Sequence, residues 1–186
     1  AYMAMCYGYE RIDYFTYWEH FNSIAAETMR QSAVMWSYDQ ASGEYVAAYQ
    51  PTYDWIKKAN AEIRGFESVI LAFDRQGTRL VTGTVASGNC FGNAKGYSGD
   101  AIANTATASY DLAVGCFELS EMKGYMLVNA DDPSYARTNT VSIDFGTDYA
   151  YAVCYVNGMA EVKALSAGKL NITLGAGDGV FAIPVK

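Results

Sequence analysis

Residues able to bind or transform a ligand follow one another near the start of the chain: Tyr17, Trp18, Glu19 and His20. They come at the carboxyl end of an apolar, aromatic run, residues 11–18. This run is apolar on both faces, which predicts a strand covered on both sides as in a parallel barrel. Because binding and catalytic groups of such barrels lie at the carboxyl ends of the strands, the sequence predicts that these residues line a ligand cleft.

Carboxylates near this run raise the question of acid–base chemistry. Glycoside hydrolysis uses two carboxyl groups, one protonated and one ionised, and Glu10, Asp13 and Glu19 are available here. Glu10 and Asp13 flank the start of the predicted strand, the end associated with stability, so a structural role is favoured for them. His20 has no Gly-x-Ser-x-Gly nucleophile motif beside it and is interpreted as a structural loop histidine. No catalytic residue is therefore assigned.

The charge and hydropathy of the chain exclude two classes of partner. Lys and Arg number 13 and Asp and Glu 20, which gives a formal net charge of −7. A net negative charge of this size repels the phosphates of nucleic acids, so we expect no nucleic-acid partner. No stretch approaches the roughly 18 apolar residues of a membrane helix. Residues 1–8 also lack the basic flank and cleavage site of a signal peptide, so we expect no membrane partner.

The cysteines do not form a metal-binding pattern. Cys6, Cys90, Cys116 and Cys154 are far apart in sequence, and His20 is the sole histidine. This spacing contains no Cys-x-x-Cys pair and no zinc motif, so we expect no metal and no cofactor. Buried free thiols are favoured over disulfides.

The first third of the chain mixes helices and strands. Residues 1–7 are apolar helix formers that end at Gly8, a residue suited to a left-handed cap. Residues 33–38 and 44–48 flank a Gly-bearing turn and predict a β-hairpin. Apolar residues spaced by three or four predict a helix over 51–64 that ends before a glycine.

From residue 67 onward the pattern changes to short strands. Residues 67–73 and 78–86 are predicted strands, and the Gly-rich segment 87–109 is predicted to form loops with at most an edge strand. Further strands are expected at 112–119, 124–129, 138–145, 149–156, 160–165, 170–174 and 179–185. Closely spaced strands without helices between them predict an antiparallel β-sandwich.

Turn residues separate these strands. Asn157-Gly158 predicts a two-residue type I′ hairpin turn. The segment 175–179 has the glycines of a phosphate loop but leads into a strand, so it is interpreted as a hairpin turn. Residues 129–132 carry oxygens suited to Ca²⁺ but lack an acidic closing ligand, so a plain turn is favoured.

Several of these segments resemble one enzyme class. Residues 4–18 resemble the last helix–strand step of a (β/α)8-barrel glycoside hydrolase of the β-galactosidase-like kind, and 53–63 are similar to the eighth barrel helix. Residues 115–118, 124–129 and 174–181 are similar to strands of the small C-terminal β-domain that such enzymes carry. The likeness extends over nearly the whole chain.

The resemblance implies a mainly β fold in two parts. Residues 1–66 would be the C-terminal remnant of the barrel, and 67–186 an antiparallel β-sandwich. The catalytic carboxylates would lie upstream of residue 1, so this chain alone is expected to be inactive. Trp18 matches the position of an aromatic platform under the sugar, with Tyr17, Glu19 and His20 beside it. The expected partners are a carbohydrate substrate and the remainder of the barrel. The alternatives are a non-catalytic carbohydrate-binding module and a structural domain.

Overall fold

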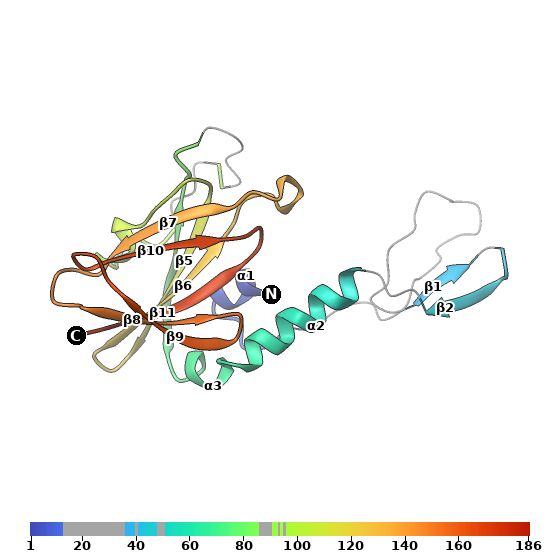
Figure 1. Ribbon diagram of the computed structural model, residues 1–186, viewed down its shortest axis with the longest axis horizontal. Coiled ribbons are helices and arrows are strands. Elements are labelled where there is room, and N and C mark those ends of the chain that lie inside the picture. The colour runs from blue at the N-terminus through green and yellow to red at the C-terminus, as the bar shows by residue number, and fades with distance from the viewer. Residues whose placement is uncertain (13–35, 40, 48–50, 86–90, 93, 95) are drawn as a thin grey trace. The chain divides into compact units, whose positions relative to one another are not determined.

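The computed structural model describes residues 1–12, 36–39, 41–47, 51–85, 91–92, 94 and 96–186 (Figure 1). The chain divides into two compact units, residues 11–61 and residues 1–10 with 62–186. The assignment of residues 1–66 to a barrel remnant stays a prediction.

The smaller unit contains a hairpin and most of a helix. Strands β1 (Trp36–Asp39) and β2 (Glu44–Ala47) pair antiparallel, which confirms the predicted hairpin. Helix α2 (Pro51–Arg64) has the predicted bounds. It begins at a proline, whose missing N–H costs nothing in the first helical turn. Of the predicted strand 11–18, residues 11–12 form neither helix nor strand, and the rest lies outside the described residues.

The larger unit is built from two antiparallel sheets. The six-stranded sheet has the order β3 (Asp74–Val81), β5 (Leu112–Leu119), β6 (Met122–Asn129), β11 (Gly179–Val185), β8 (Tyr151–Val156) and β9 (Met159–Ala164). The three-stranded sheet has the order β10 (Lys169–Leu174), β7 (Asn139–Asp144) and β4 (Thr107–Ala108). Short helices accompany them: α1 (Tyr2–Cys6), α3 (Glu67–Ile70), η1 (Ala103–Thr105) and η2 (Pro133–Tyr135). The prediction of a mainly β, antiparallel structure is confirmed.

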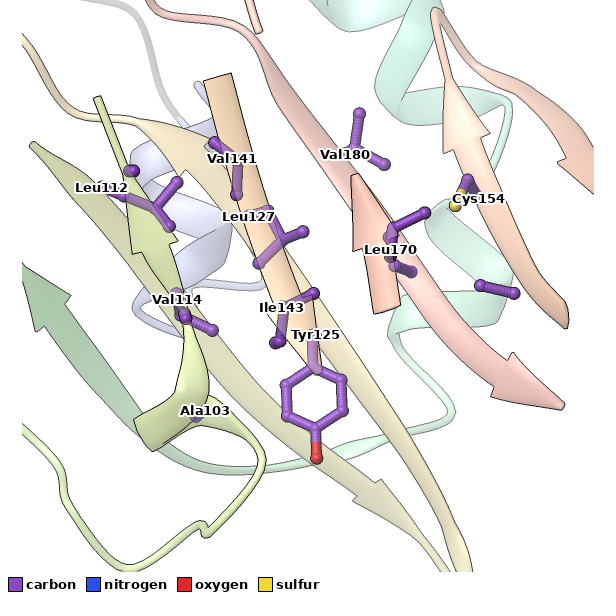
Figure 2. Close-up of a cluster of buried hydrophobic side chains, with 14 of the residues drawn as sticks. Ala103, Leu112, Val114, Tyr125, Leu127, Val141, Ile143, Cys154, Leu170 and Val180 are labelled. Atoms are coloured by element: carbon purple, nitrogen blue, oxygen red, sulfur yellow. The ribbon is translucent and has the colours of Figure 1, made fainter. Parts of the chain in front are cut away.

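The two sheets enclose a common apolar core. Leu112, Val114 and Leu127 of the six-stranded sheet lie in one buried cluster with Ile143 and Leu170 of the three-stranded sheet (Figure 2). Each fully buried side chain of this size stabilises the fold by about 1.5–3 kcal/mol. Buried and more exposed residues alternate along β7 and β10, so these strands present one face to the core.

Helix α1 covers part of the other face of the six-stranded sheet. A Cβ on Gly115 would lie 2.6 Å from the carbonyl oxygen of Cys6, so only glycine lets the helix approach this closely. The hydroxyl of Thr78 donates to the same carbonyl at 2.9 Å. With helix on one side and core on the other, β5 is buried from Leu112 to Phe117, which explains why no charged residue occurs before Glu118.

The sequence prediction is wrong for residues 67–73, which form α3 and a turn in place of a strand. Phe66, Ile70 and Phe73 are all buried, and their spacing of four and three is that of a helix face. The strand predicted at 78–86 is β3, which begins and ends earlier, at Asp74 and Val81.

Two turn predictions have different outcomes. Asn157 and Gly158 have φ of +50° and +79° and join β8 to β9, which confirms the two-residue hairpin turn. The prediction of a hairpin at 175–179 is wrong, because β10 and β11 belong to different sheets. This segment crosses between the sheets, and the Asp178 carboxylate closes it by accepting from the Gly175 N–H at 3.1 Å.

Candidate functional site

The residues predicted to line a ligand cleft, Tyr17, Trp18, Glu19 and His20, lie outside the described residues. Their role stays a prediction. Of the carboxylates near them, Glu10 is described and is exposed to solvent.

In the larger unit, Arg137 lies between η2 and β7 and contacts one acidic and two aromatic side chains. Arg137 donates through Nε and Nη2 to the two carboxylate oxygens of Asp131, each at 2.6 Å. Its guanidinium carbon lies 4.5 Å from the ring centre of Tyr110 and 4.1 Å from that of Tyr135. Planar guanidinium groups favour both contacts, the bidentate pair and the stacking on aromatic rings. We call Tyr110, Asp131, Tyr135 and Arg137 the Arg137 cluster.

The turn before Arg137 sets the position of Tyr135. The Asp132 carboxylate accepts from the Ser134 N–H at 2.9 Å and caps η2, which has a proline at its start. Ala136 then adopts a left-handed backbone, which returns the chain toward the sheet. Tyr135 is left 59% exposed on this turn. Since the carboxylates of Asp131 and Asp132 both serve the turn itself, the interpretation as a plain turn fits better than a Ca²⁺ loop.

Two buried asparagines hold the backbone around this cluster. The Asn139 side chain accepts from the Tyr110 N–H and donates to the Tyr110 carbonyl, both at 3.0 Å. The Asn129 amide donates to the carbonyls of Arg137 at 3.2 Å and Gly175 at 2.9 Å. Because buried amides strongly prefer satisfied hydrogen bonds, these contacts fix the loops that carry the rings. The exposed Tyr135 ring is thus held in place by its neighbours.

A second polar cluster surrounds Asp100. Its carboxylate accepts from Lys123 Nζ at 2.7 Å, from the Tyr125 hydroxyl at 3.2 Å and from the Ala103 N–H at 2.8 Å. Burial acts to raise the pKa of Asp100, but these hydrogen bonds outweigh it and hold the pKa below its ordinary value. The donors surround a buried carboxylate and join the segment before η1 to β6, which is a structural role.

The described cysteines are buried thiols. Cys6, Cys116 and Cys154 are free, which confirms that prediction for these three, and Cys90 lies outside the described residues. Burial raises the pKa of all three thiols, to about 12 for Cys116 and about 11 for Cys154. They are therefore protonated at neutral pH and are not nucleophiles there.

Two features are absent from the described residues. Among them, no group of three or more His, Cys, Asp or Glu side chains is placed to hold a metal ion. Within the same residues, no helix has both the length and the apolar character needed to cross a membrane.

Comparison of the chain with protein-family models, curated proteins and solved structures gives no match. The likeness to glycoside hydrolases rests on the short sequence patterns given above.

The sequence did not predict the Arg137 cluster. Tyr110 lies between β4 and β5, and Tyr135 and Arg137 lie between β6 and β7. The β4–β7 and β5–β6 pairings therefore bring Tyr110 to Arg137. The one available signal was Asp-Asp-Pro-Ser-Tyr, a turn sequence that ends in an aromatic residue.

Proposed function

We propose that this chain is the C-terminal part of a (β/α)8-barrel glycoside hydrolase of the β-galactosidase-like kind. In this proposal Trp18 is the aromatic platform under the bound sugar, with Tyr17, Glu19 and His20 as its neighbours. The residues 67–186 form an accessory β-domain, and the catalytic carboxylates lie upstream of this chain. An indole ring binds the C–H face of a sugar and orients it without proton transfer.

The observation that carries this proposal is the order of elements that follows Trp18. A hairpin comes first, and the helix Pro51–Arg64 follows it where the resemblance, over residues 53–63, expects the last barrel helix. After the short helix α3 the chain forms antiparallel sheets, and the resemblance expects such strands in the accessory domain. This order supports the proposal because the resemblance also expects a barrel helix after Trp18 and antiparallel strands after that helix.

A second function, that of a non-catalytic carbohydrate-binding module, is favoured by one observation. Tyr135 is 59% exposed, and its ring is held by the stacked guanidinium of Arg137. In this alternative the aromatic platform lies on the β-sandwich. The two functions therefore differ in which aromatic residue binds the glycan.

An activity assay tests the assignment of the catalytic groups. The chain is incubated with aryl glycosides of several sugars, and release of the phenol is followed. The proposal predicts no turnover, since the catalytic carboxylates belong to the upstream part of the enzyme. Turnover that survives Glu19→Gln would contradict it, because the carboxylates would then lie elsewhere in this chain.

A binding assay tests the platform. Oligosaccharides that bind on a glycan array are titrated into the wild type while tryptophan fluorescence is recorded. The proposal predicts a fluorescence change that Trp18→Ala abolishes. Trp55→Ala is the matched control, because Trp55 is also a tryptophan and is 67% exposed on α2. A change that persists in Trp18→Ala and disappears in Trp55→Ala would contradict the platform role of Trp18.

A further inference from the structure

The outward face of β11, β8 and β9 is apolar at every position. In these strands the residues whose side chains share this face form three cross-strand rows: Phe181, Tyr155 and Ala160; Ile183, Val153 and Val162; Val185, Tyr151 and Ala164. Phe66 covers the first row, with its ring centre 5.7 Å from that of Tyr155. In the other rows Ile183 and Val153 are half-buried, and the side chains nearest the edge are exposed, Val162 to 71%.

Strand β9 has an unusual distribution of polar residues. Its charged side chains, Glu161 and Lys163, lie on the opposite face from the apolar rows and contact each other at 2.9 Å. A solvated edge strand normally carries its polar residues on the exposed outer face. Val162, the most exposed large apolar residue of the described part, stands at the middle of this strand.

The backbone of β9 is available for pairing along one side. Among the described strands, β9 is the last of its sheet and pairs only with β8. The two-residue turn makes Val156 and Met159 a hydrogen-bonded pair, and such pairs alternate along an antiparallel ladder. The N–H and C=O groups of Ala160, Val162 and Ala164 therefore point toward the open edge.

The sequence of β9 is complementary to itself in one antiparallel register. When Val162 of one copy lies opposite Val162 of another, Ala160 lies opposite Ala164. Glu161 of each copy then lies opposite Lys163 of the other. These two positions form non-hydrogen-bonded pairs, in which side chains approach most closely. A lysine on an edge strand ordinarily opposes pairing, but in this register it meets a carboxylate.

We propose that two copies of this chain associate through β9, which pairs antiparallel with its counterpart about a two-fold axis at Val162. The pairing joins the two six-stranded sheets into one continuous sheet with about six new main-chain hydrogen bonds. The interface is isologous, as in most homodimers. The proposal rests on β9 alone and is independent of the proposed enzymatic function.

Analytical ultracentrifugation across a concentration series tests the proposal. The wild type is expected to reach twice the mass of the chain at high concentration. Val162→Pro removes the N–H at the centre of the open edge, but it leaves the ladder to β8 intact because that N–H points outward. It is expected to be monomeric at every concentration, whereas Val162→Thr, which keeps the N–H, is expected to dimerise. A thermal unfolding curve for each variant verifies that it folds.

Reversal of single charges on β9 provides a second test of the dimer, which leaves the backbone N–H groups in place. Glu161→Lys places Lys opposite Lys and Lys163→Glu places Glu opposite Glu, so each is expected to weaken the dimer about ten- to hundredfold. When these two variants are mixed, every cross-strand pair becomes attractive, and a heterodimer is expected to form. Glu121→Lys, an equal change at an exposed turn residue, is the control and is expected to dimerise like the wild type.

Particular results would overturn the proposal. One is a wild type that stays monomeric at the highest concentration. Another is a dimer that persists in Val162→Pro and is lost in Val185→Lys, since Val185 lies on the apolar face away from the edge and this result would indicate face-to-face packing. Failure of the two charge variants to associate on mixing would also contradict the register.

Discussion

The hydroxyl of Tyr2 donates a hydrogen bond of 2.5 Å to Oε2 of Glu62, although 60 residues separate them in sequence. Both side chains are buried, and the bond joins α1 to the last turn of α2. Glu62 also contacts Gly158, where a Cβ would lie 2.8 Å from its backbone. These contacts connect α1 to the last turn of α2, and that turn to the β8–β9 hairpin.

Replacement of Tyr2 by Phe removes this donor and leaves the packing of the ring unchanged. Because hydrogen bonds to a charged, buried partner stabilise strongly, we predict that Tyr2→Phe lowers the free energy of unfolding by about 1.5–3 kcal/mol. Urea unfolding measures this loss. Tyr9→Phe, at a residue 67% exposed, is the control and is expected to change stability by less than about 0.5 kcal/mol. Equal effects at the two positions would contradict the structural role of the Tyr2–Glu62 bond.

Gly115 permits α1 to lie against the sheet. A Cβ there would lie 2.6 Å from the Cys6 carbonyl oxygen, so α1 must shift to accept a methyl group. We predict that Gly115→Ala destabilises the fold by about 1–3 kcal/mol, the range for overpacking. The same substitution at Gly92, where a Cβ would meet nothing within 4 Å, separates the packing effect from that of adding a methyl group. Because the φ of Gly92 is +59°, this control carries a backbone cost of about 1 kcal/mol.

Protonation of the Asp100 carboxylate at acid pH should lower the stability of the folded protein. The folded-state pKa of Asp100 lies below its ordinary value, because the bonds from Lys123, Ala103 and Tyr125 outweigh the effect of burial. The stabilisation it provides is therefore complete above the unfolded-state pKa, about 3.9. It is lost as the pH falls through the lower folded-state pKa.

Thermal unfolding at a series of pH values measures this contribution. We predict that Asp100→Asn has a lower Tm than the wild type at pH 7 and that the difference narrows below pH 4. Asp148→Asn, at an exposed loop residue, should follow the wild-type profile. A constant difference between Asp100→Asn and wild type down to pH 2 would show that the charge of Asp100 does not stabilise the fold.

Ionisation of the buried thiols should lower the stability of the fold at alkaline pH. Burial raises the pKa of Cys154 to about 11 and of Cys116 to about 12, above the unfolded-state value of about 8.5. The unfolded state therefore releases protons first, and stability should be complete below about pH 8.5 and fall as the pH rises through 11.

Alkylation by iodoacetamide at pH 8 tests the same burial at each residue. Peptide mass spectrometry should find Cys6, Cys116 and Cys154 unmodified in the native protein and modified in 6 M guanidinium. Rapid labelling of Cys154 in the native state would contradict its burial in the core.

The sequence predicted elements that are governed by local rules. The helix from Pro51 to Arg64 and the turn at Asn157-Gly158 follow from proline at a first turn and from residues that adopt positive φ. The prediction at 67–73 was wrong because Phe66, Ile70 and Phe73 share a helix face within a run that is too short to show its period. The residue pattern of 67–73 alone was therefore insufficient to distinguish a helix from a strand.

Features that depend on strand pairing could not be predicted from the sequence. The turn at 175–179 crosses between sheets because β10 pairs with β7, a partner that its residues do not specify. In the same way, the contact of Arg137 with Tyr110 depends on strand pairing, whereas its contact with Tyr135 is made within one turn. The predicted platform at Trp18 needed no pairing, since it was placed by its position after an apolar run.

The most direct test of the proposed function is the affinity of one oligosaccharide, identified on a glycan array, for the wild type and three variants, measured by calorimetry. The account predicts that Trp18→Ala abolishes binding, Trp18→Phe retains it, and Tyr135→Ala leaves it unchanged. Binding that is lost in Tyr135→Ala and intact in Trp18→Ala would contradict the account and place the sugar on the β-sandwich.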